Sequence, residues 1–164
     1  MQKAEYWIDR LQLAGHPEGG YYRETYRSSG SYALSTPFNG SRSYATAIYY
    51  LLKGSDRSKL HRIHSDELWF FHAGDPLKVF MFPKHGEPSS FTLGLSEENS
   101  EVLQESVPAE SWFGACLENP ESDSFSLVSC VVAPGFEFRD FAFADRITLL
   151  KKFPKHQEII ERLT

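Results

Sequence analysis

Short apolar segments separated by turn residues run along most of the chain. Most of them are rich in aliphatic and aromatic residues, and Gly, Pro, Asp or Ser lies between them. The predicted strands are 44–52, 58–63, 67–73, 77–82, 90–95, 101–106, 111–118, 125–132 and 136–143. Strands at this spacing favour a β-sandwich or barrel. The predicted fold is therefore all-β, a small antiparallel double-stranded barrel.

Helical periodicity occurs only at the two ends. Apolar residues at i, i+3/i+4 and i+7 spacing predict an amphipathic helix over 3–13, which Gly15 ends. Residues 145–163, interrupted at Pro154, predict one or two further helices. These elements predict short N- and C-terminal helices around a β core.

The segment between the first helix and the first apolar strand is polar. Residues 21–28 alternate in the manner of a strand, whereas residues 28–43 contain two glycines, Pro37 and Asn39 and predict a long loop. No repeat, low-complexity stretch or linker divides the chain, so we expect a single domain over 1–164.

Composition and charge narrow the function classes. Aromatic residues make up 15% of the chain, which favours a β core and a cavity lined by rings. The net charge of −5 and the lack of a Lys/Arg run argue against a nucleic-acid partner. No apolar run approaches the roughly 20 residues that span a bilayer, so no membrane partner is expected. Cys116 and Cys130 lie in apolar segments without CxxC spacing, which predicts buried free thiols in a reducing cytoplasm.

Titratable residues concentrate in the stretch 61–76. They are His61, His64, Asp66, Glu67, His72 and Asp75. Such side chains between two apolar strands are costly to bury without partners, so they indicate a solvated cavity. We interpret Asp66 and Asp75 as turn residues, and His64 and His72 as turn or outer-face residues.

His61 and Glu67 are an even number of residues apart, so a continuous strand would place them on one face. A carboxylate beside an imidazole can orient it as a general base. The alternative is a histidine of the barrel that is hydrogen-bonded to a glutamate and takes no part in chemistry.

An epimerase needs an acid on the face opposite its base, and a tyrosine hydroxyl is a candidate. The candidates are Tyr22, Tyr26, Tyr49 and Tyr50, of which Tyr50 is preferred. Strand packing is the alternative for each of them.

Arg23 and Arg27 fall on one face of the strand 21–28 and Glu24 on the other. The arginines either pair internally or bind a phosphate or carboxylate. Glu137 and Asp140 are expected at the mouth of the cavity, and His16 and Glu18 have either a loop-structuring or a pocket role.

Two motifs carry a resemblance to the cupins. His61, Glu67 and Gly74 keep the spacing of the first cupin motif, and 107–113 resembles the second. The blocks 16–27, 47–52, 61–76 and 132–138 resemble a small cupin subfamily of uncharacterised proteins described as predicted sugar epimerases. The resemblance implies a jelly-roll barrel, usually a homodimer.

The sequence departs from the metal-binding cupins. Those proteins have a second histidine two residues after the first, where this chain has Ile63, and another histidine in the second motif, where it has Phe113. The usual glycine of the second motif is Glu110. Two of four ligand positions are apolar, so we expect no metal and no cofactor.

The predicted function is a cytoplasmic cupin that binds a small polar ligand, a sugar or sugar nucleotide, and acts as an epimerase or isomerase. His61 would be the base, Glu67 its orienting carboxylate and Tyr50 the acid. The candidate ligand contacts are Tyr22, Arg23, Glu24, Arg27, His64, Trp69, Phe71, Trp112 and Phe113. A non-catalytic binding cupin is the alternative; a metal-dependent oxygenase or isomerase is a third hypothesis, which Ile63 and Phe113 oppose.

Overall fold

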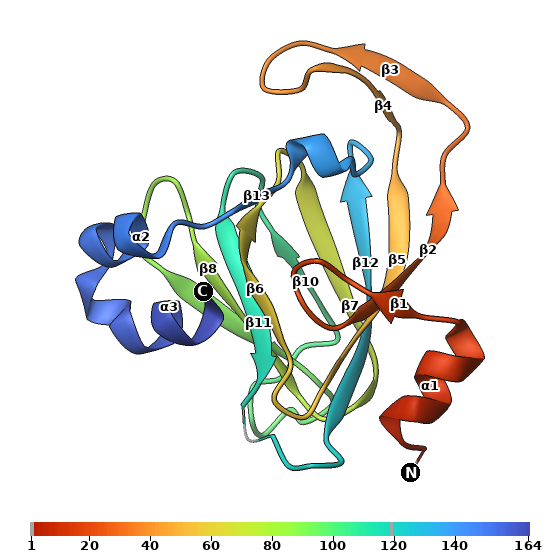
Figure 1. The fold of residues 1–164 in the computed structure, drawn as a ribbon, viewed down its shortest axis with the longest axis vertical. Coiled ribbons are helices and arrows are strands. Elements are labelled where there is room, and N and C mark those ends of the chain that lie inside the picture. Colours follow the sequence, from red (N-terminus) through yellow and green to blue (C-terminus); the bar gives the residue numbers. More distant parts are fainter. Residues whose placement is uncertain (1, 119) are drawn as a thin grey trace.

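Two facing β-sheets form the body of the molecule in the computed structural model, which describes residues 2–118 and 120–164 (Figure 1). The first sheet has the order β1-β2-β5-β12-β7-β10 and the second β13-β6-β11-β8-β9, with antiparallel neighbours throughout. The first comprises β1 (Ala14–Gly15), β2 (Tyr21–Arg27), β5 (Thr46–Lys53), β7 (Asp66–Gly74), β10 (Gln104–Val107) and β12 (Phe125–Ala133). The second comprises β6 (Arg57–Arg62), β8 (Leu77–Phe82), β9 (Ser89–Leu93), β11 (Trp112–Leu117) and β13 (Ala142–Phe143). The predicted all-β barrel is confirmed.

Alternation along the strands divides the apolar side chains between an inner core and two outer clusters. Tyr50 and Leu52 of β5 join the core between the sheets, whereas Leu51 points outward. The helix α1 (Ala4–Leu11) covers Leu51 on the outer face of the first sheet. The first helix therefore packs on the barrel wall, away from its interior.

The C-terminal helices cover the outer face of the second sheet. They are α2 (Arg146–Lys152) and α3 (Gln157–Leu163), joined by the 3-10 helix η2 (Pro154–His156). The Asp145 carboxylate accepts the Thr148 backbone N–H at 2.9 Å and caps α2. The predicted terminal helices are confirmed, and none of the helices described has the length and apolar character needed to cross a membrane.

The predicted loop over 28–43 is wrong, because this segment forms a β-hairpin. Strands β3 (Ser31–Leu34) and β4 (Gly40–Ser43) pair antiparallel and arch beyond one end of the barrel (Figure 1). Stacked rings of Tyr32 and Tyr44, 5.1 Å between centroids, pack at its base. The two short strands are largely exposed, so the sequence has no apolar alternation to reveal them.

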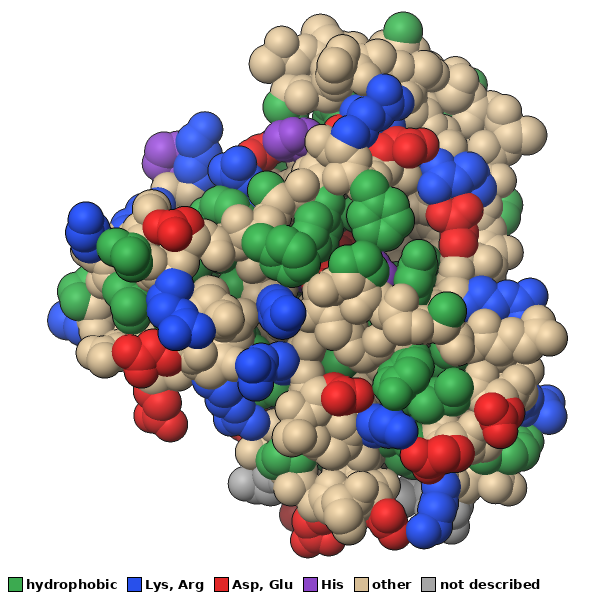
Figure 2. All heavy atoms as spheres, in the orientation of Figure 1, with side chains coloured by type: hydrophobic (Ala, Val, Ile, Leu, Met, Phe, Trp, Pro, Cys, Tyr) green, Lys and Arg blue, Asp and Glu red, His purple; other side chains and the backbone are tan. Residues whose placement is uncertain are grey.

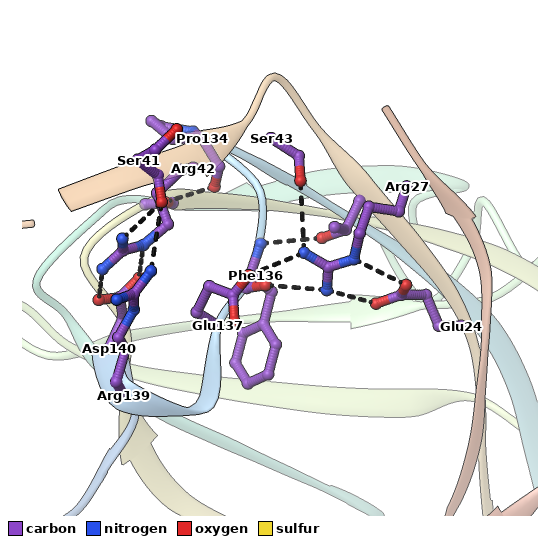
Figure 3. A network of polar contacts seen from close by, with 12 residues as sticks. Glu24, Arg27, Ser41, Arg42, Ser43, Pro134, Phe136, Glu137, Arg139 and Asp140 are labelled. Carbon is purple, nitrogen blue, oxygen red and sulfur yellow. Dashed lines mark hydrogen bonds and ion pairs between the residues drawn. The ribbon is translucent and has the colours of Figure 1, made fainter. Parts of the chain in front are cut away.

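The predicted strand over 136–143 is also wrong. The chain forms the 3-10 helix η1 (Phe138–Asp140) there, followed by the two-residue strand β13. The buried Asp140 accepts two hydrogen bonds from the buried Arg42, at 2.6 and 2.5 Å. This pair joins η1 to the hairpin, and sequence periodicity does not report such a long-range contact (Figure 3).

We expect Arg42→Met to destabilise the protein by about 3–5 kcal/mol, since it leaves the Asp140 carboxylate buried without its partner. Urea unfolding followed by circular dichroism measures this loss. The double variant Arg42→Met/Asp140→Leu should recover most of it, because no buried charge remains. Equal losses in the single and double variants would contradict this explanation, because the loss would then not come from an unpaired Asp140 carboxylate.

Candidate functional site

A cavity of about 130 Å³ lies between the two sheets. Its wall combines aromatic and aliphatic side chains with a group of titratable ones, and Figure 2 shows histidine and acidic side chains in a hollow ringed by hydrophobic groups. The titratable and charged lining residues are His16, Glu18, Glu24, Arg27, His61, Glu67, Cys130 and Glu137. Tyr22 and Thr46 add hydroxyl groups.

The loop between β1 and β2 brings Glu18 into the barrel. The Gly19 N–H donates to the His16 carbonyl at 3.0 Å, and the Glu18 carbonyl accepts the Lys59 N–H of β6 at 2.9 Å. Gly19 has φ +116°, and a Cβ there would fall on the Arg57 carbonyl, so the turn requires glycine. The loop is thus fixed against β6, the strand that carries His61.

His61 and Glu18 form a buried pair, 3% and 7% exposed. Glu18 Oε2 lies 3.2 Å from His61 Nε2, and Glu18 Oε1 accepts the Ser58 hydroxyl at 2.8 Å. His61 Nδ1 lies 2.7 Å from the Lys59 carbonyl, which can only accept, so Nδ1 carries a hydrogen. A neutral His61 therefore has its lone pair on Nε2, and the Glu18 carboxylate beside it would stabilise a proton gained there.

Two aromatic rings hold the His61 imidazole. The Phe113 ring is tilted against it at 4.2 Å between centroids, and the Phe141 ring stacks on it at 5.0 Å. This packing fixes the direction of Nε2, so Glu18 is the carboxylate that orients His61. Sequence analysis expected Glu67 in that position, and the structure corrects this expectation.

His16 is a neutral neighbour of the pair. Its Nδ1 accepts the Glu18 backbone N–H at 3.2 Å, so the ring hydrogen is on Nε2. Burial lowers the pKa of His16, an effect that the Glu18 charge opposes and the nearby His61 reinforces. His16 therefore contributes a neutral N–H donor to the lining.

Glu67 lies on β7, in the sheet opposite the one that carries His61. Burial, together with the charge of Glu18, raises the pKa of Glu67 to about 8, although a hydrogen bond with the Cys130 thiol opposes the shift. The carboxyl group is thus mainly protonated at neutral pH. The cavity has a His–Glu pair on one wall and a neutral carboxylic acid on the other.

An arginine flanked by two carboxylates lies at the mouth (Figure 3). Arg27 donates to both oxygens of Glu24, at 2.9 and 2.8 Å, and to Glu137 at 3.0 Å. Strict alternation predicted Arg27 and Glu24 on opposite faces, but the register of β2 shifts between Glu24 and Tyr26. This bulge brings the two side chains to one face and corrects that prediction.

The remaining polar candidates lie outside the lining. Tyr50 is buried, its hydroxyl donates to the Gly19 carbonyl at 2.8 Å, and burial raises its pKa well above the usual range. Its position favours support of the loop over proton donation to a ligand. Arg23 turns outward to the Leu11 carbonyl at 3.0 Å, and His64 pairs with Glu110 at 2.5 Å.

The aromatic candidates are packing residues in this structure. Trp69, Phe71 and Phe113 belong to the core between the sheets. Trp112 packs with the cluster under the C-terminal helices, and the Arg62 guanidinium lies over its ring. The phenylalanine rings that line the cavity are instead those of Phe136 and Phe138.

Glu18 and His16 are the main residues whose role sequence reasoning left open. The only indication in the sequence is an acidic residue between a proline and two glycines, which predicts a turn. The sequence does not reveal that this turn packs against the strand that carries His61. Glu137, expected at the mouth, does line the cavity, whereas Asp140 pairs with Arg42.

The lining does not fit a cupin metal ion. Ile63 lines the cavity where a second ligand histidine would be, and Phe113 packs against His61. Within 2–118 and 120–164, no three His, Cys, Asp or Glu side chains converge as a metal-binding group. We therefore derive no chemical step through a metal.

Comparison with known proteins agrees with this architecture. Residues 5–144 match the family described as "Cupin superfamily (DUF985)". Uncharacterized protein YML079W of Saccharomyces cerevisiae is 36% identical over 146 residues, which cover 83% of this chain and 72% of that protein.

Two solved structures are similar over nearly their whole length. A hypothetical protein from Leishmania major superposes with a TM-score of 0.90 at 36% identity, covering 99% of both chains. Protein SO0799 from Shewanella oneidensis superposes with a TM-score of 0.87 at 38% identity, covering 100% of this chain and 98% of that one. A dTDP sugar isomerase from Desulfovibrio desulfuricans G20, at 14% identity and a TM-score of 0.52 over 81% of this chain and 87% of that one, shares the fold alone.

The raised pKa of Glu67 predicts a pH-dependent stability difference. Between pH 4.5 and 8 the Glu67 carboxyl group loses its proton in the unfolded chain and keeps it in the folded protein. The free energy of unfolding therefore falls by up to about 1.4 kcal/mol for each unit that the pH rises. Glu67→Gln removes this loss. The variant should therefore gain stability relative to the wild type as pH rises from 5 to 8, measured by urea unfolding at each pH. A stability difference independent of pH would contradict the assignment.

Proposed function

We propose, from the premise that the chain belongs to the cupin superfamily (DUF985), that its barrel cavity binds a small polar molecule and moves a proton on it. The observation that carries the proposal is the buried contact of 3.2 Å between His61 Nε2 and Glu18 Oε2 inside that cavity. An imidazole–carboxylate pair is a common general base in enzymes. The cytoplasmic homodimer predicted from the sequence remains part of the proposal.

The two walls of the cavity suit an epimerase or isomerase. His61 projects from the second sheet and Glu67 from the first, so a ligand between them meets a base on one face and a protonated acid on the other. Inversion of configuration requires that a proton leaves one face and returns on the opposite one. The distribution of groups over the two sheets supplies both partners.

In the proposed reaction, His61 takes a proton from the carbon next to a carbonyl group and leaves an enolate. The imidazolium that forms is stabilised by the Glu18 carboxylate. The N–H of neutral His16 is a donor for the enolate oxygen, and Glu67 returns a proton to the opposite face of the carbon. Aldehyde and keto sugars are the class of substrate with such a carbon.

We expect the wild-type protein to accelerate the exchange of solvent deuterium into the carbon next to the carbonyl of a substrate sugar. His61→Asn should slow this exchange about 10²–10⁴-fold, because it removes the base. Proton NMR in D₂O with a panel of aldoses and ketoses measures the rate. Glu18→Gln should also slow exchange, since an amide cannot stabilise the imidazolium by charge.

His64→Asn is the matched control, because His64 also contacts a glutamate, Glu110, but lies outside the cavity. It should exchange at the wild-type rate. Full exchange by folded His61→Asn would contradict the proposal. Binding of a sugar without exchange would instead establish the second hypothesis, a binding cupin that does not turn its ligand over.

A further inference from the structure

The charges around the cavity bear on the class of ligand that it accepts. Three lining carboxylates, Glu18, Glu24 and Glu137, are accompanied by the protonated Glu67 and, within 2–118 and 120–164, by one permanent cation, Arg27. His61 lies beside the Glu18 carboxylate, and the neutral His16 adds no charge. The lining therefore has an excess of negative charge.

Arg27 has no N–H group left for an anion. A guanidinium has five N–H donors. Arg27 directs them to the two Glu24 oxygens, to Glu137, to the Phe136 carbonyl at 3.1 Å and to the Ser43 hydroxyl at 3.3 Å. A phosphate at the mouth would have to displace a carboxylate to reach this group.

The other arginines near this end of the barrel are also engaged elsewhere. Arg42 is buried against Asp140, and Arg139 donates to the Ser41 carbonyl at 3.3 Å. Arg23 is turned to the end of α1. Of the two alternatives that the sequence left open for Arg23 and Arg27, their positions support pairing within the protein and not phosphate binding.

The cavity is small, so the part of a large ligand that does not fit inside it would lie at the mouth. A volume of about 130 Å³ is below the ~300–1,000 Å³ of pockets that enclose drug-sized ligands, so only the reacting end of a sugar nucleotide would enter. Its diphosphate would then lie beside the carboxylates of Glu24 and Glu137, which are 38% and 39% exposed. Like charges that lie side by side repel.

We infer that the cavity selects a small polar ligand that is uncharged or positively charged, such as a free sugar or an amino sugar, and excludes phosphorylated sugars and sugar nucleotides. The inference rests on the proposed function in taking this cavity as the binding site. It narrows the substrate class from sugars and sugar nucleotides to those without phosphate or carboxylate groups.

The two cysteines allow a direct test that needs no identified ligand. Cys130 lines the cavity, whereas Cys116 lines a surface groove in which three basic side chains outnumber two acidic ones. These are Lys78, Lys155, Arg162, Glu118 and Glu158. Cys116→Ser leaves Cys130 as the single thiol, and Cys130→Ser leaves Cys116 as the matched control. Each variant is treated with methyl methanethiosulfonate, its cationic 2-aminoethyl analogue and its anionic 2-sulfonatoethyl analogue.

In each reaction the cysteine thiolate forms a disulfide with the reagent and methanesulfinate leaves. Rates are followed by mass spectrometry and divided by the rate of the same reagent with 2-mercaptoethanol. Burial raises the pKa of the Cys130 thiol, which slows all three reactions together and leaves their ratio unchanged. The ratio of the cationic to the anionic rate therefore reports the potential inside the cavity.

We expect this ratio to be at least 10 at Cys130 and about 1 or lower at Cys116. Adding Glu24→Gln and Glu137→Gln to the Cys116→Ser protein should lower the Cys130 ratio several-fold, because it removes two negative charges and frees Arg27. A Cys130 ratio of 1 or below would overturn the inference. Failure of the neutral reagent to modify Cys130 would also overturn it, since the cavity would then not admit a small molecule.

This readout does not depend on turnover. A negative potential at Cys130 without deuterium exchange would leave a binding cavity for uncharged or cationic ligands, and only the catalytic proposal would fail. Exchange on a sugar phosphate, with no preference for the cationic reagent, would support the proposed function and overturn this inference about ligand charge.

Discussion

The burial of Glu18 is the constraint on which the site depends. A carboxylate that is 7% exposed needs partners, and Ser58 and His61 provide them from the adjacent strand. The backbone around Glu18 is tied to the same strand, because its carbonyl accepts the Lys59 N–H. The loop conformation, the position of β6 and the orientation of the imidazole are therefore linked through Glu18. Loss of either Ser58 or His61 would leave its buried carboxylate with one partner fewer.

The two sheets divide the chemistry between them. His61 on β6 and Glu18 in the loop between β1 and β2 face Glu67 on β7, whose burial raises its pKa to about 8. Glu18 is paired with an imidazole, whereas Glu67 has mainly the Cys130 thiol and apolar neighbours. The barrel can thus hold a proton acceptor and a proton donor a short distance apart because each occupies a different wall.

Sequence patterns over a few neighbouring residues predicted the strands and helices correctly where contacts between near neighbours determine them. Turn residues and apolar segments located the main strands, and the helical periodicity at both ends was confirmed. His61 and Glu67 both line the cavity, but from strands of opposite sheets and not from one face of a continuous strand. Errors arose where a distant partner decides the conformation. Glu18 depends on a strand some forty residues away, Asp140 on Arg42, and the side of Arg27 on a bulge in β2 that alternation cannot reveal. Hydrophobic periodicity contains no information on these contacts.

Because all five N–H groups of Arg27 have partners, the residues around it could determine which ligand charge a related protein accepts. Because Glu24 and Glu137 accept three of its five donors, loss of either carboxylate would expose part of a guanidinium at the mouth while the strands and the His61 environment stay in place. On the inference above, a single substitution would already weaken the rejection of anions at the entrance. Family members with the same barrel could therefore differ in ligand charge, and the residues at positions 24 and 137 would distinguish them more directly than overall sequence identity.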